Sequence, residues 1–379
     1  MSGPLAGLRV LEIGHMLAGP YCGLLLADLG AEVIKIEPPA GDIAREASPH
    51  FIGPHNAYFA SLNRSKRGVV IDLASAEGQS QLRQLARSSH ALVTNLRPSA
   101  IRKLGLTYES LEAVNPKLVC VALTGFGLQS PYAERPAYDY IIQAMTGVME
   151  LTGDPGTLPT KTGYSAVDNS AGTFAALGLL AKVHSGEGGQ IDIAMYDVML
   201  SQLNYVASGI LNGGERSQRH ASSAHPYFVP AQVFRTRDSW MVLFITHDSF
   251  WRVFAEEVGH PEWVTSPQHA TIAARSANRA RVVADVAAVL QEEETEHWLG
   301  RLLPLGIVAA GISTLDRALE SEQVRARGML VDISTADGTI RLVGNPIKVV
   351  GAVENFMPPP QLGADNLALL GPCTPHDAA

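Results

Sequence analysis

The 379-residue sequence contains little cysteine, few charged side chains and no long apolar run. Its three cysteines, Cys22, Cys120 and Cys373, show no CxxC spacing, so we predict neither a disulfide framework nor a cysteine zinc site. That pattern favours a reducing, cytoplasmic compartment. The best apolar runs, 16–27 and 171–181, are shorter than the about 20 residues that a membrane-spanning helix needs. The N-terminus has no basic segment ahead of an apolar one, so we predict no signal peptide and no membrane partner.

Charged residues make up only 17% of the chain, and 37 acidic residues against 29 basic ones give a formal net charge of −8. A negative surface argues against a nucleic-acid partner, because attraction to phosphates needs a basic footprint. It leaves room for a local basic pocket that binds an anionic small molecule. Apolar residues reach 46%, which is typical of a well-buried globular protein and not of a disordered chain.

Several motifs of cofactor, nucleophile and metal chemistry are also missing. The turn Gly14-His-Met-Leu-Ala-Gly19 lacks the G-x-G-x-x-G pattern that lets a backbone approach a pyrophosphate, so we predict no NAD. No glycine precedes Lys161 as a P-loop requires, and no G-x-S-x-G nucleophile elbow occurs. The twelve histidines form no H-x-x-x-H pair, and we therefore predict no metal site.

The sequence does contain a regular alternation of apolar runs and helical segments. We predict buried strands at 9–14, 32–37, 68–73, 91–95, 118–124 and 189–194. We predict helices at 18–29, 76–88, 99–104, 141–149, 169–183 and 196–211. Strands and helices that alternate at this spacing predict an α/β fold with a parallel sheet covered on both faces.

The second half of the chain indicates a smaller domain. A polar, glycine-bearing segment at 212–224 is a candidate linker. Beyond it, VFRTRDSWMVLFI (233–245) is typical of a hairpin. The last stretch of the chain is too short to fold alone, so we expect it to return to the earlier domain.

Two polar clusters before predicted helices have both a structural and a catalytic interpretation. Asp168 precedes the longest apolar helix, where helix capping is the ordinary explanation. A carboxylate there would also be held ionised by the helix dipole and free N–H groups, which suits a nucleophile. The stretch from Arg135 through Tyr138 and Asp139 is explained as a loop entering the next helix, with Asp139 as its cap.

A third cluster places basic residues after a predicted strand. Asn95, Leu96 and Arg97 follow the strand at 91–95, and Lys103 comes shortly afterwards. Bases at the carboxyl end of a parallel strand are well sited for a phosphate-bearing ligand. Solvated charges on a helix face are the plainer explanation.

Taken together, these segments resemble the family III CoA-transferases, the superfamily of formyl-CoA transferase, carnitine CoA-transferase and α-methylacyl-CoA racemase. The resemblance is carried by GLRVLEIGHMLAGPYCGLLLADLGAEVIKIEPPAGDIAR (7–45), SLNRSKRGVVIDL (61–73), NLRPSAIRKLGL (95–106), LTGFGLQSPYAERPAYDYIIQAMTG (123–147), GYSAVDNSAGTFAALGLLA (163–181), GQIDIAMYDVML (189–200) and PPPQLGADNLALLG (358–371). Separate motifs in the family's order make the match specific.

The resemblance implies a domain organisation that composition could not show. It implies a Rossmann-like large domain formed by residues 1–211 and 321–379, and a smaller α+β domain at 225–308. Linkers at 212–224 and 309–320 would join them. Two such chains would interlock as a homodimer.

The resemblance also implies an acyl-CoA:carboxylate CoA-transferase that works on small organic acids, with dicarboxylates such as succinate favoured. Asp168 would be the nucleophile, passing through an anhydride and an aspartyl-CoA thioester, and Tyr138 would position the substrate. Racemases of the superfamily carry a histidine where this chain has Tyr138, and a phenol, with an ordinary pKa of about 10, is a poor base near neutrality. The alternatives are an α-methylacyl-CoA racemase and a catalytically weak CoA-binding homologue.

The residues expected to bind coenzyme A come from three parts of the sequence. They are His15, Met16, Leu17 and Ala18 in the loop after the first strand, Asn95 and Leu96 on the adenine side, and the basic residues Arg97, Lys103 and Arg135. Lys103 stands where formyl-CoA transferase has a phosphate-binding arginine. Leu17 replaces the glutamine that touches oxalate in that enzyme, which puts oxalate in doubt and leaves the acceptor open.

Overall fold

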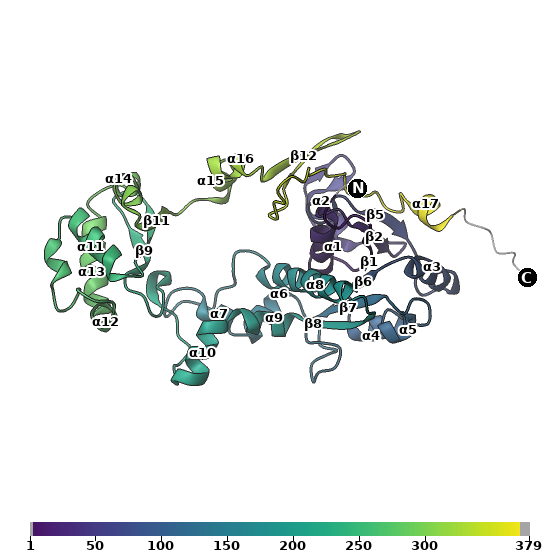
Figure 1. Cartoon of the computed structure of the whole chain (residues 1–379), viewed down its shortest axis with the longest axis horizontal. Helices are drawn as coiled ribbons and strands as arrows, with labels where there is room; N and C mark the ends of the chain where they lie inside the picture. The colour runs from purple at the N-terminus through teal and green to yellow at the C-terminus, as the bar shows by residue number, and fades with distance from the viewer. Residues whose placement is uncertain (1–2, 372–379) are drawn as a thin grey trace, which may run out of the picture. The chain divides into compact units, whose positions relative to one another are not determined.

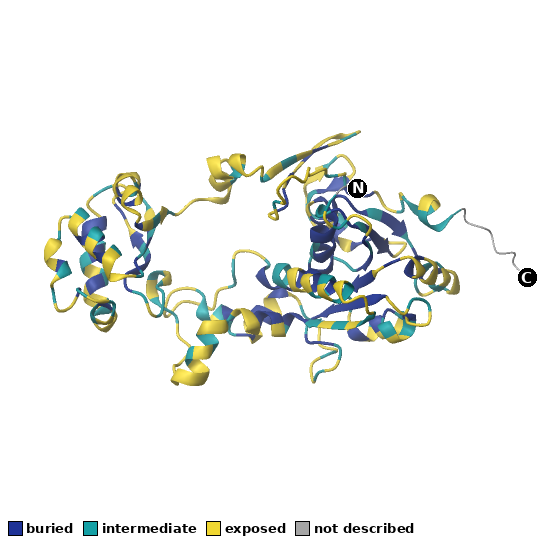
Figure 2. Ribbon diagram, in the orientation of Figure 1, coloured by how far each residue is buried: buried dark blue, intermediate teal, exposed yellow. Residues whose placement is uncertain are grey.

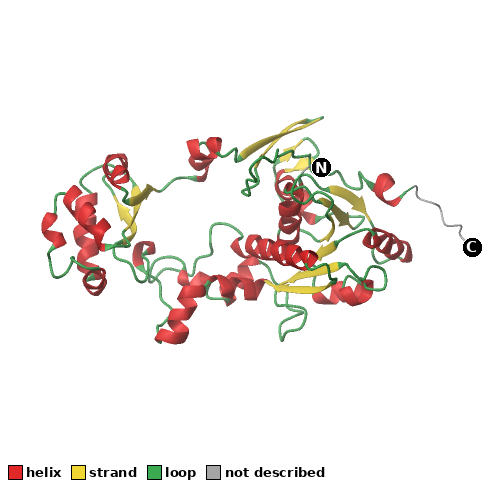
Figure 3. Cartoon of the chain, in the orientation of Figure 1, coloured by secondary structure: helices red, strands yellow, loops and turns green. Residues whose placement is uncertain are grey.

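The computed structural model describes residues 3–371, in two compact units (Figure 3). Among these residues, unit 1 comprises 3–146, 162–213 and 322–371, and unit 2 comprises 147–161 and 214–321. Unit 1 therefore draws on chain from both ends of the sequence. The linker bounds expected from the resemblance stay a prediction. Cys22 and Cys120 are buried, free thiols, and Cys373 lies outside the described residues.

Unit 1 is built on a six-stranded parallel sheet in the order β5-β2-β1-β6-β7-β8. The strands are β1 (Arg9–Ile13), β2 (Glu32–Glu37), β5 (Arg67–Val70), β6 (Ala91–Thr94), β7 (Val119–Thr124) and β8 (Gly189–Ala194). Counted along the chain, this is the order 3-2-1-4-5-6 of doubly wound dinucleotide-binding folds. The predicted α/β fold with a parallel sheet is confirmed.

Helices cover both faces of this sheet (Figure 1). On one face α1 (Ala18–Asp28) packs against α8 (Ala166–His184). On the other face α3 (Ala76–Arg87), α4 (Pro98–Lys103) and α5 (Tyr108–Leu111) bury apolar side chains against alternate strand residues. Strands β1, β2, β6 and β7 are buried along nearly all of their length, whereas the edge strand β8 alternates between half-buried and exposed residues (Figure 2).

Unit 1 also contains shorter elements around the sheet. They are η1 (Ile43–Glu46), α2 (Ala57–Asn63), α6 (Asp139–Met145), α9 (Met195–Gln202), α10 (Asn204–Gly213), α16 (Glu322–Ala326), α17 (Asn366–Leu370) and the hairpins β3–β4 (Phe51–Ile52, His55–Asn56) and β12–β13 (Leu330–Thr335, Gly338–Val343). The helix predicted at 196–211 is thus two helices. The helix predicted at 141–149 is also divided, because Gly147 adopts a left-handed φ of 86° between α6 and α7 (Val148–Leu151).

Unit 2 has its own small antiparallel sheet and hydrophobic core. The sheet order is β11-β10-β9, formed by β9 (Ala231–Arg235), β10 (Trp240–Phe244) and β11 (Val308–Gly311), and the hairpin predicted at 233–245 is confirmed. The helices are α11 (Asp248–Glu257), α12 (Ile272–Ala277), α13 (Arg279–Leu290), α14 (Thr295–Leu302) and α15 (Leu315–Leu319), with 3₁₀ turns η2 (Ala221–Ser223), η3 (Pro261–Val264) and η4 (Leu303–Leu305). Large side chains such as Trp251, Phe254 and Trp298 fill the core. Within residues 3–371, no helix is long and apolar enough to span a bilayer.

The C-terminal segment closes the outer edge of the parallel sheet at β5. Asp365 accepts hydrogen bonds from the Gly68 backbone N–H (2.9 Å) and the Arg67 side chain (3.0 Å). Asn366 Oδ1 accepts a hydrogen bond from the Val70 N–H at 2.8 Å. An edge strand exposes unpaired backbone groups, so these side chains satisfy donors that would otherwise face solvent or another chain.

Replacing Asn366 by alanine tests this closure. We expect Asn366→Ala to lower the free energy of unfolding by about 1 kcal/mol, because it leaves the Val70 N–H without its partner. Hydrogen exchange at Val70 should accelerate. The control is Gln81→Ala: among residues 3–371 the Gln81 amide bonds only to Glu77, one helical turn away. Unchanged exchange at Val70 would show that the segment does not hold this edge.

Candidate active site

A cavity of about 360 Å³ lies at the carboxyl ends of the central strands of unit 1. The cavity lies at the end of β1, which is paired with β2 on one side and with β6 on the other. Ligands of doubly wound folds bind in this crevice, where the strand order reverses. All residues predicted for the site except Lys103 line the cavity: His15, Met16, Leu17, Ala18, Asn95, Leu96, Arg97, Arg135, Tyr138 and Asp168.

Asn95 fixes the loop that follows β1. Its Oδ1 accepts a hydrogen bond from the His15 N–H at 3.0 Å, and its Nδ2 donates to the His15 carbonyl at 2.9 Å. A Cβ at Gly14 would lie 2.2 Å from Asn95 Oδ1, and one at Gly19 would lie 3.0 Å from it. A side chain at position 14 would displace the Asn95 amide, so Gly14 leaves room for Asn95, which directly follows β6, to hold the loop.

The basic residues of the third cluster separate in the structure. Arg97 and Arg135 line the cavity, and the Arg135 guanidinium lies 3.7 Å from the centre of the Tyr132 ring. Lys103 is exposed at the end of α4 and does not line this cavity. Its neighbour Arg102 is paired with Glu134. The role expected for Lys103 stays a prediction.

Asp168 lies inside the first turn of α8, and the predicted helix start at residue 169 is wrong. The cap comes from Asp139, which lies at the start of α6 and is only 3% exposed. Asp139 Oδ1 accepts a hydrogen bond from the Val167 N–H at 2.9 Å, and Gln143 donates to Oδ2 at 2.6 Å. Asp139 thus caps α8, where the sequence suggested that it capped its own helix.

The buried carboxyl group of Asp139 and the half-buried one of Asp168 therefore lie near the same helix end. Burial, and then the charge of Asp139, raise the pKa of Asp168 to about 7. Within residues 3–371 the Asp168 carboxylate accepts no hydrogen bond that would oppose these effects. Burial and the charge of Asp139 therefore act against the helix dipole, which the sequence suggested would hold Asp168 ionised.

Three tyrosines, Tyr58, Tyr138 and Tyr140, line the same cavity. Tyr138 precedes α6 and is 61% exposed. Tyr58, from α2, was not predicted, since nothing in its sequence surroundings indicates a site. Burial, and then the charge of Asp168, raise the pKa of Tyr58, which shows that the two side chains are near one another. In residues 3–371 no three His, Cys, Asp or Glu side chains gather as a metal site would require.

The sequence matches the family described as CoA-transferase family III over residues 5–366. The chain belongs to CoA-transferase family III. It is an enzyme of this class, and the resemblance stated from the sequence is confirmed. CoA-transferases of this family use CoA thioesters as substrates.

Relatives and a solved structure agree with this membership. The succinate–glutarate CoA-transferase of Agrobacterium fabrum is 34% identical over 353 residues, covering 89% of this chain and 87% of that protein. The acetyl-CoA:oxalate CoA-transferase of Acetobacter aceti is 33% identical over 355 residues, covering 92% and 90%. A crystal structure of a CaiB/BaiF family protein from Brucella suis has a TM-score of 0.84 at 32% identity, covering 98% of this chain and 99% of that one.

The raised pKa of Asp168 predicts how the stability of this CoA-transferase depends on pH. The folded protein binds more protons than the unfolded chain between pH 3.8 and about 7, so its stability falls as the pH rises through this range and then levels off. Asp168→Asn removes the buried charge. We expect this variant to match the natural protein near pH 4 and to be more stable above pH 7, on the order of 2 kcal/mol. Melting temperatures at a series of pH values measure the difference, and a difference independent of pH would contradict the raised pKa.

Proposed function

We propose that this enzyme is an acyl-CoA:carboxylate CoA-transferase in which Asp168 is a covalent nucleophile. The observation that carries the proposal is a half-buried carboxylate, without a hydrogen-bond partner among residues 3–371, in a cavity at the strand ends of a family III CoA-transferase. A carboxylate that accepts few hydrogen bonds keeps its oxygen electron pairs available for attack on a carbonyl carbon. With a pKa of about 7, about half of the Asp168 side chains are ionised at neutral pH, and the anion is more nucleophilic than an ordinary aspartate.

In the proposed reaction, Asp168 first attacks the thioester carbon of the donor. The C–S bond breaks, CoA leaves as its thiolate, and a mixed anhydride forms. The thiolate then attacks the Asp168 carbonyl carbon, which releases the donor acid as a carboxylate and leaves an aspartyl-CoA thioester. The acceptor carboxylate repeats these steps in reverse and departs as the new acyl-CoA. Every step exchanges one acyl bond for another, so the thioester energy is conserved while water is kept out.

The backbone of the loop after β1 supplies donors for the oxyanions that form. The first N–H groups of a helix have no partner within it. α1 begins at Ala18, and no side chain among residues 3–371 caps it at Leu17. Ala18 lines the cavity with Asp168, so we propose that its N–H stabilises the oxyanion, together with the positive end of the helix dipole.

We propose small dicarboxylates such as succinate as the acids exchanged. The two relatives described above are named for the dicarboxylates succinate, glutarate and oxalate, the last with acetyl-CoA as the other substrate. Arg97 and Arg135 are cations that line the cavity and are available to CoA phosphates or to a second carboxylate. Leu17 offers no side-chain donor to a substrate as short as oxalate, so we propose the longer acids. Tyr138, at the rim, would position the substrate.

Trapping the intermediate tests the proposal. We expect succinyl-CoA followed by hydroxylamine to convert Asp168, and no other aspartate, to a hydroxamate that peptide mass spectrometry detects. Asp168→Asn should lower kcat by about 10³-fold or more, because an amide cannot attack the thioester, while CoA still binds. Transfer that persists in Asp168→Asn would contradict the mechanism. Exchange of the C2 proton of a branched acyl-CoA, without CoA transfer, would identify a racemase.

We also propose that two chains interlock as a homodimer. Helix α10 buries none of its residues within residues 3–371, yet it carries apolar side chains: Tyr205, Ile210 and Leu211. Leu177 on α8 is also 63% exposed. Apolar side chains gathered on helices in this way favour a protein–protein interface. The burial colours of Figure 2 show α10 as mostly exposed.

A charged substitution on this helix tests the homodimer. We expect sedimentation analysis to give the mass of two chains. Leu211 is 81% exposed in the single chain. We expect Leu211→Glu to shift the protein toward monomer, because the dimer would have to bury an unpaired charge at the interface. Gln84→Glu, on the exposed face of α3, is the control and should leave the dimer intact. A natural protein that sediments as a monomer would overturn the proposal.

A further inference from the structure

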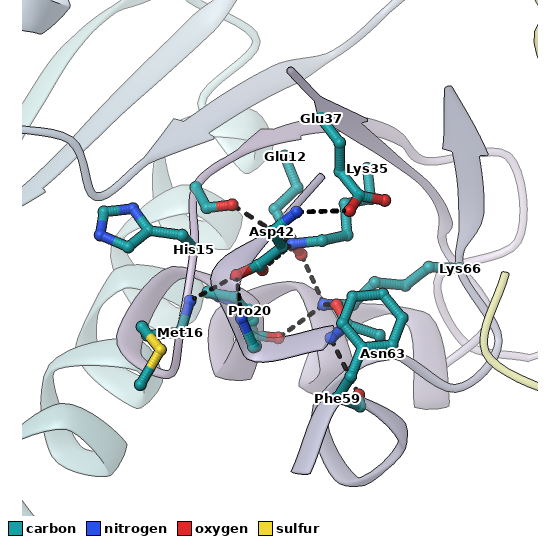
Figure 4. Close-up of polar contacts among 12 residues, drawn as sticks. Glu12, His15, Met16, Pro20, Lys35, Glu37, Asp42, Phe59, Asn63 and Lys66 are labelled. Carbon is teal, nitrogen blue, oxygen red and sulfur yellow. Dashed lines mark hydrogen bonds and ion pairs between the residues drawn. The ribbon is translucent and has the colours of Figure 1, made fainter. Parts of the chain in front are cut away.

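A fully buried cluster of charges lies beneath the loop that lines the cavity (Figure 4). Glu12 on β1 lies between two lysines, at 3.1 Å from Lys35 Nζ and 2.6 Å from Lys66 Nζ. None of these three side chains has any exposed surface. Glu12 and Lys35 are register partners on adjacent strands, and Lys66 directly precedes β5.

Each lysine also holds one end of the loop after β1. Lys35 Nζ donates to the Gly14 carbonyl at 3.2 Å, at the start of the loop. Lys66 Nζ donates to the Pro20 carbonyl at 2.8 Å, in the first turn of α1, and to Asn63 Oδ1 at 2.9 Å. Both ends of the segment that carries His15 to Ala18 are therefore tied to the same buried charges.

Asp42 connects the cluster to the middle of the loop. Its Oδ2 lies 2.8 Å from Lys35 Nζ, and its Oδ1 accepts a hydrogen bond from the Met16 N–H at 3.2 Å. Met16 has a φ of 61°, in the left-handed region that side-chain-bearing residues rarely adopt. Figure 4 shows Asp42 between Lys35 and the Met16 backbone. The unfavourable backbone conformation of Met16 is thus held by a carboxylate outside the cavity lining.

Burying these charges would destabilise the folded protein unless opposite charges balance one another. Removing a charge from water costs several kcal/mol, and only good pairing offsets that cost. Two carboxylates, Glu12 and Asp42, face two ammonium groups, Lys35 and Lys66. Burial acts to lower the pKa of Lys35, but Glu12 and Asp42 outweigh it and raise that pKa. Burial, reinforced by the charge of Lys35, lowers the pKa of Lys66 to about 8 despite the attraction of Glu12. Apolar side chains would fill this space at lower cost, so the cluster is better explained by the geometry that it imposes.

We propose that Asp42 is a positioning residue for substrate binding. Held by Lys35, it fixes the Met16 N–H and so keeps the loop from His15 to Ala18 in the shape that receives acyl-CoA. The proposal rests on the proposed function in one respect, that this cavity takes acyl-CoA. Asp42 does not line the cavity, and its contact with the loop is the hydrogen bond from the Met16 N–H. Its charge also reaches two residues that line the cavity: it adds to burial and Asp168 in raising the pKa of Tyr58, and it acts against the burial that lowers the pKa of His15.

Asp28 provides a matched control at the opposite end of α1. Its side chain is 1% exposed and forms an ion pair with Arg64 at 2.6 Å, far along the helix from the loop. Asp42→Ala and Asp28→Ala each break one buried ion pair, so both should lower the stability of unit 1. Only Asp42→Ala also removes the acceptor of the Met16 N–H.

The experiment compares CoA affinity by calorimetry, amide exchange at Met16, and steady-state kinetics in these variants. We expect Asp42→Ala to weaken CoA binding about tenfold, to accelerate exchange at Met16, and to raise KM more than it lowers kcat. Asp28→Ala should leave all three near the natural values. Asp42→Asn keeps an oxygen that can accept a hydrogen bond from the Met16 N–H, so it should retain more CoA affinity than Asp42→Ala. If the alanine variants do not fold, Asp42→Asn and Asp28→Asn are compared in their place.

Equal CoA affinities and equal Met16 exchange in the Asp42 and Asp28 variants would overturn the positioning role. This result is distinct from failure of the proposed function, which is decided by labelling of Asp168 in the unaltered protein. CoA binding and amide exchange do not depend on catalysis. The two proposals can therefore fail separately.

Discussion

One hydrogen bond, from the Val167 N–H to the buried carboxylate of Asp139, joins α6 to the start of α8 and sets the chemistry of the cavity. Because Asp139 provides the cap, Asp168 in the same helical turn is left without a hydrogen-bond partner among residues 3–371. Burial and the nearby charge of Asp139 then raise its pKa to about 7. This environment sets Asp168 apart from an ordinary surface aspartate and supports the proposal that it is the nucleophile.

The opposite wall of the cavity is organised by buried polar side chains and not by packing alone. Asn95 pairs with both backbone groups of His15, and Asp42 holds Met16 in a left-handed conformation. Behind the loop, the charges of Lys35 and Lys66 are balanced by the carboxylates of Glu12 and Asp42. Loop and helix start are thus fixed before any ligand arrives, which lowers the entropy that binding must overcome.

The sequence predicts the sheet well: β2 and β8 have the bounds expected for them, and the fully buried β7 is a continuous apolar run. It predicts the cavity because residues after parallel strands meet at one sheet edge. It could not predict the cap on α8, since Asp139 lies 28 residues before Val167 and the contact depends on how α6 packs. Tyr58 and the Lys35–Asp42 pair were missed for the same reason. Buried charges carry no sequence signature that distinguishes them from exposed ones.

The most direct test of covalent transfer through Asp168 follows oxygen atoms and not rates. The enzyme is incubated with an unlabelled acyl-CoA and an acceptor acid whose carboxylate carries oxygen-18, and its peptides are then examined by mass spectrometry. We expect one labelled oxygen from the acceptor to enter the Asp168 carboxyl group as the product thioester forms, while Asp139 stays unlabelled. Formation of the product without label at Asp168 would contradict it.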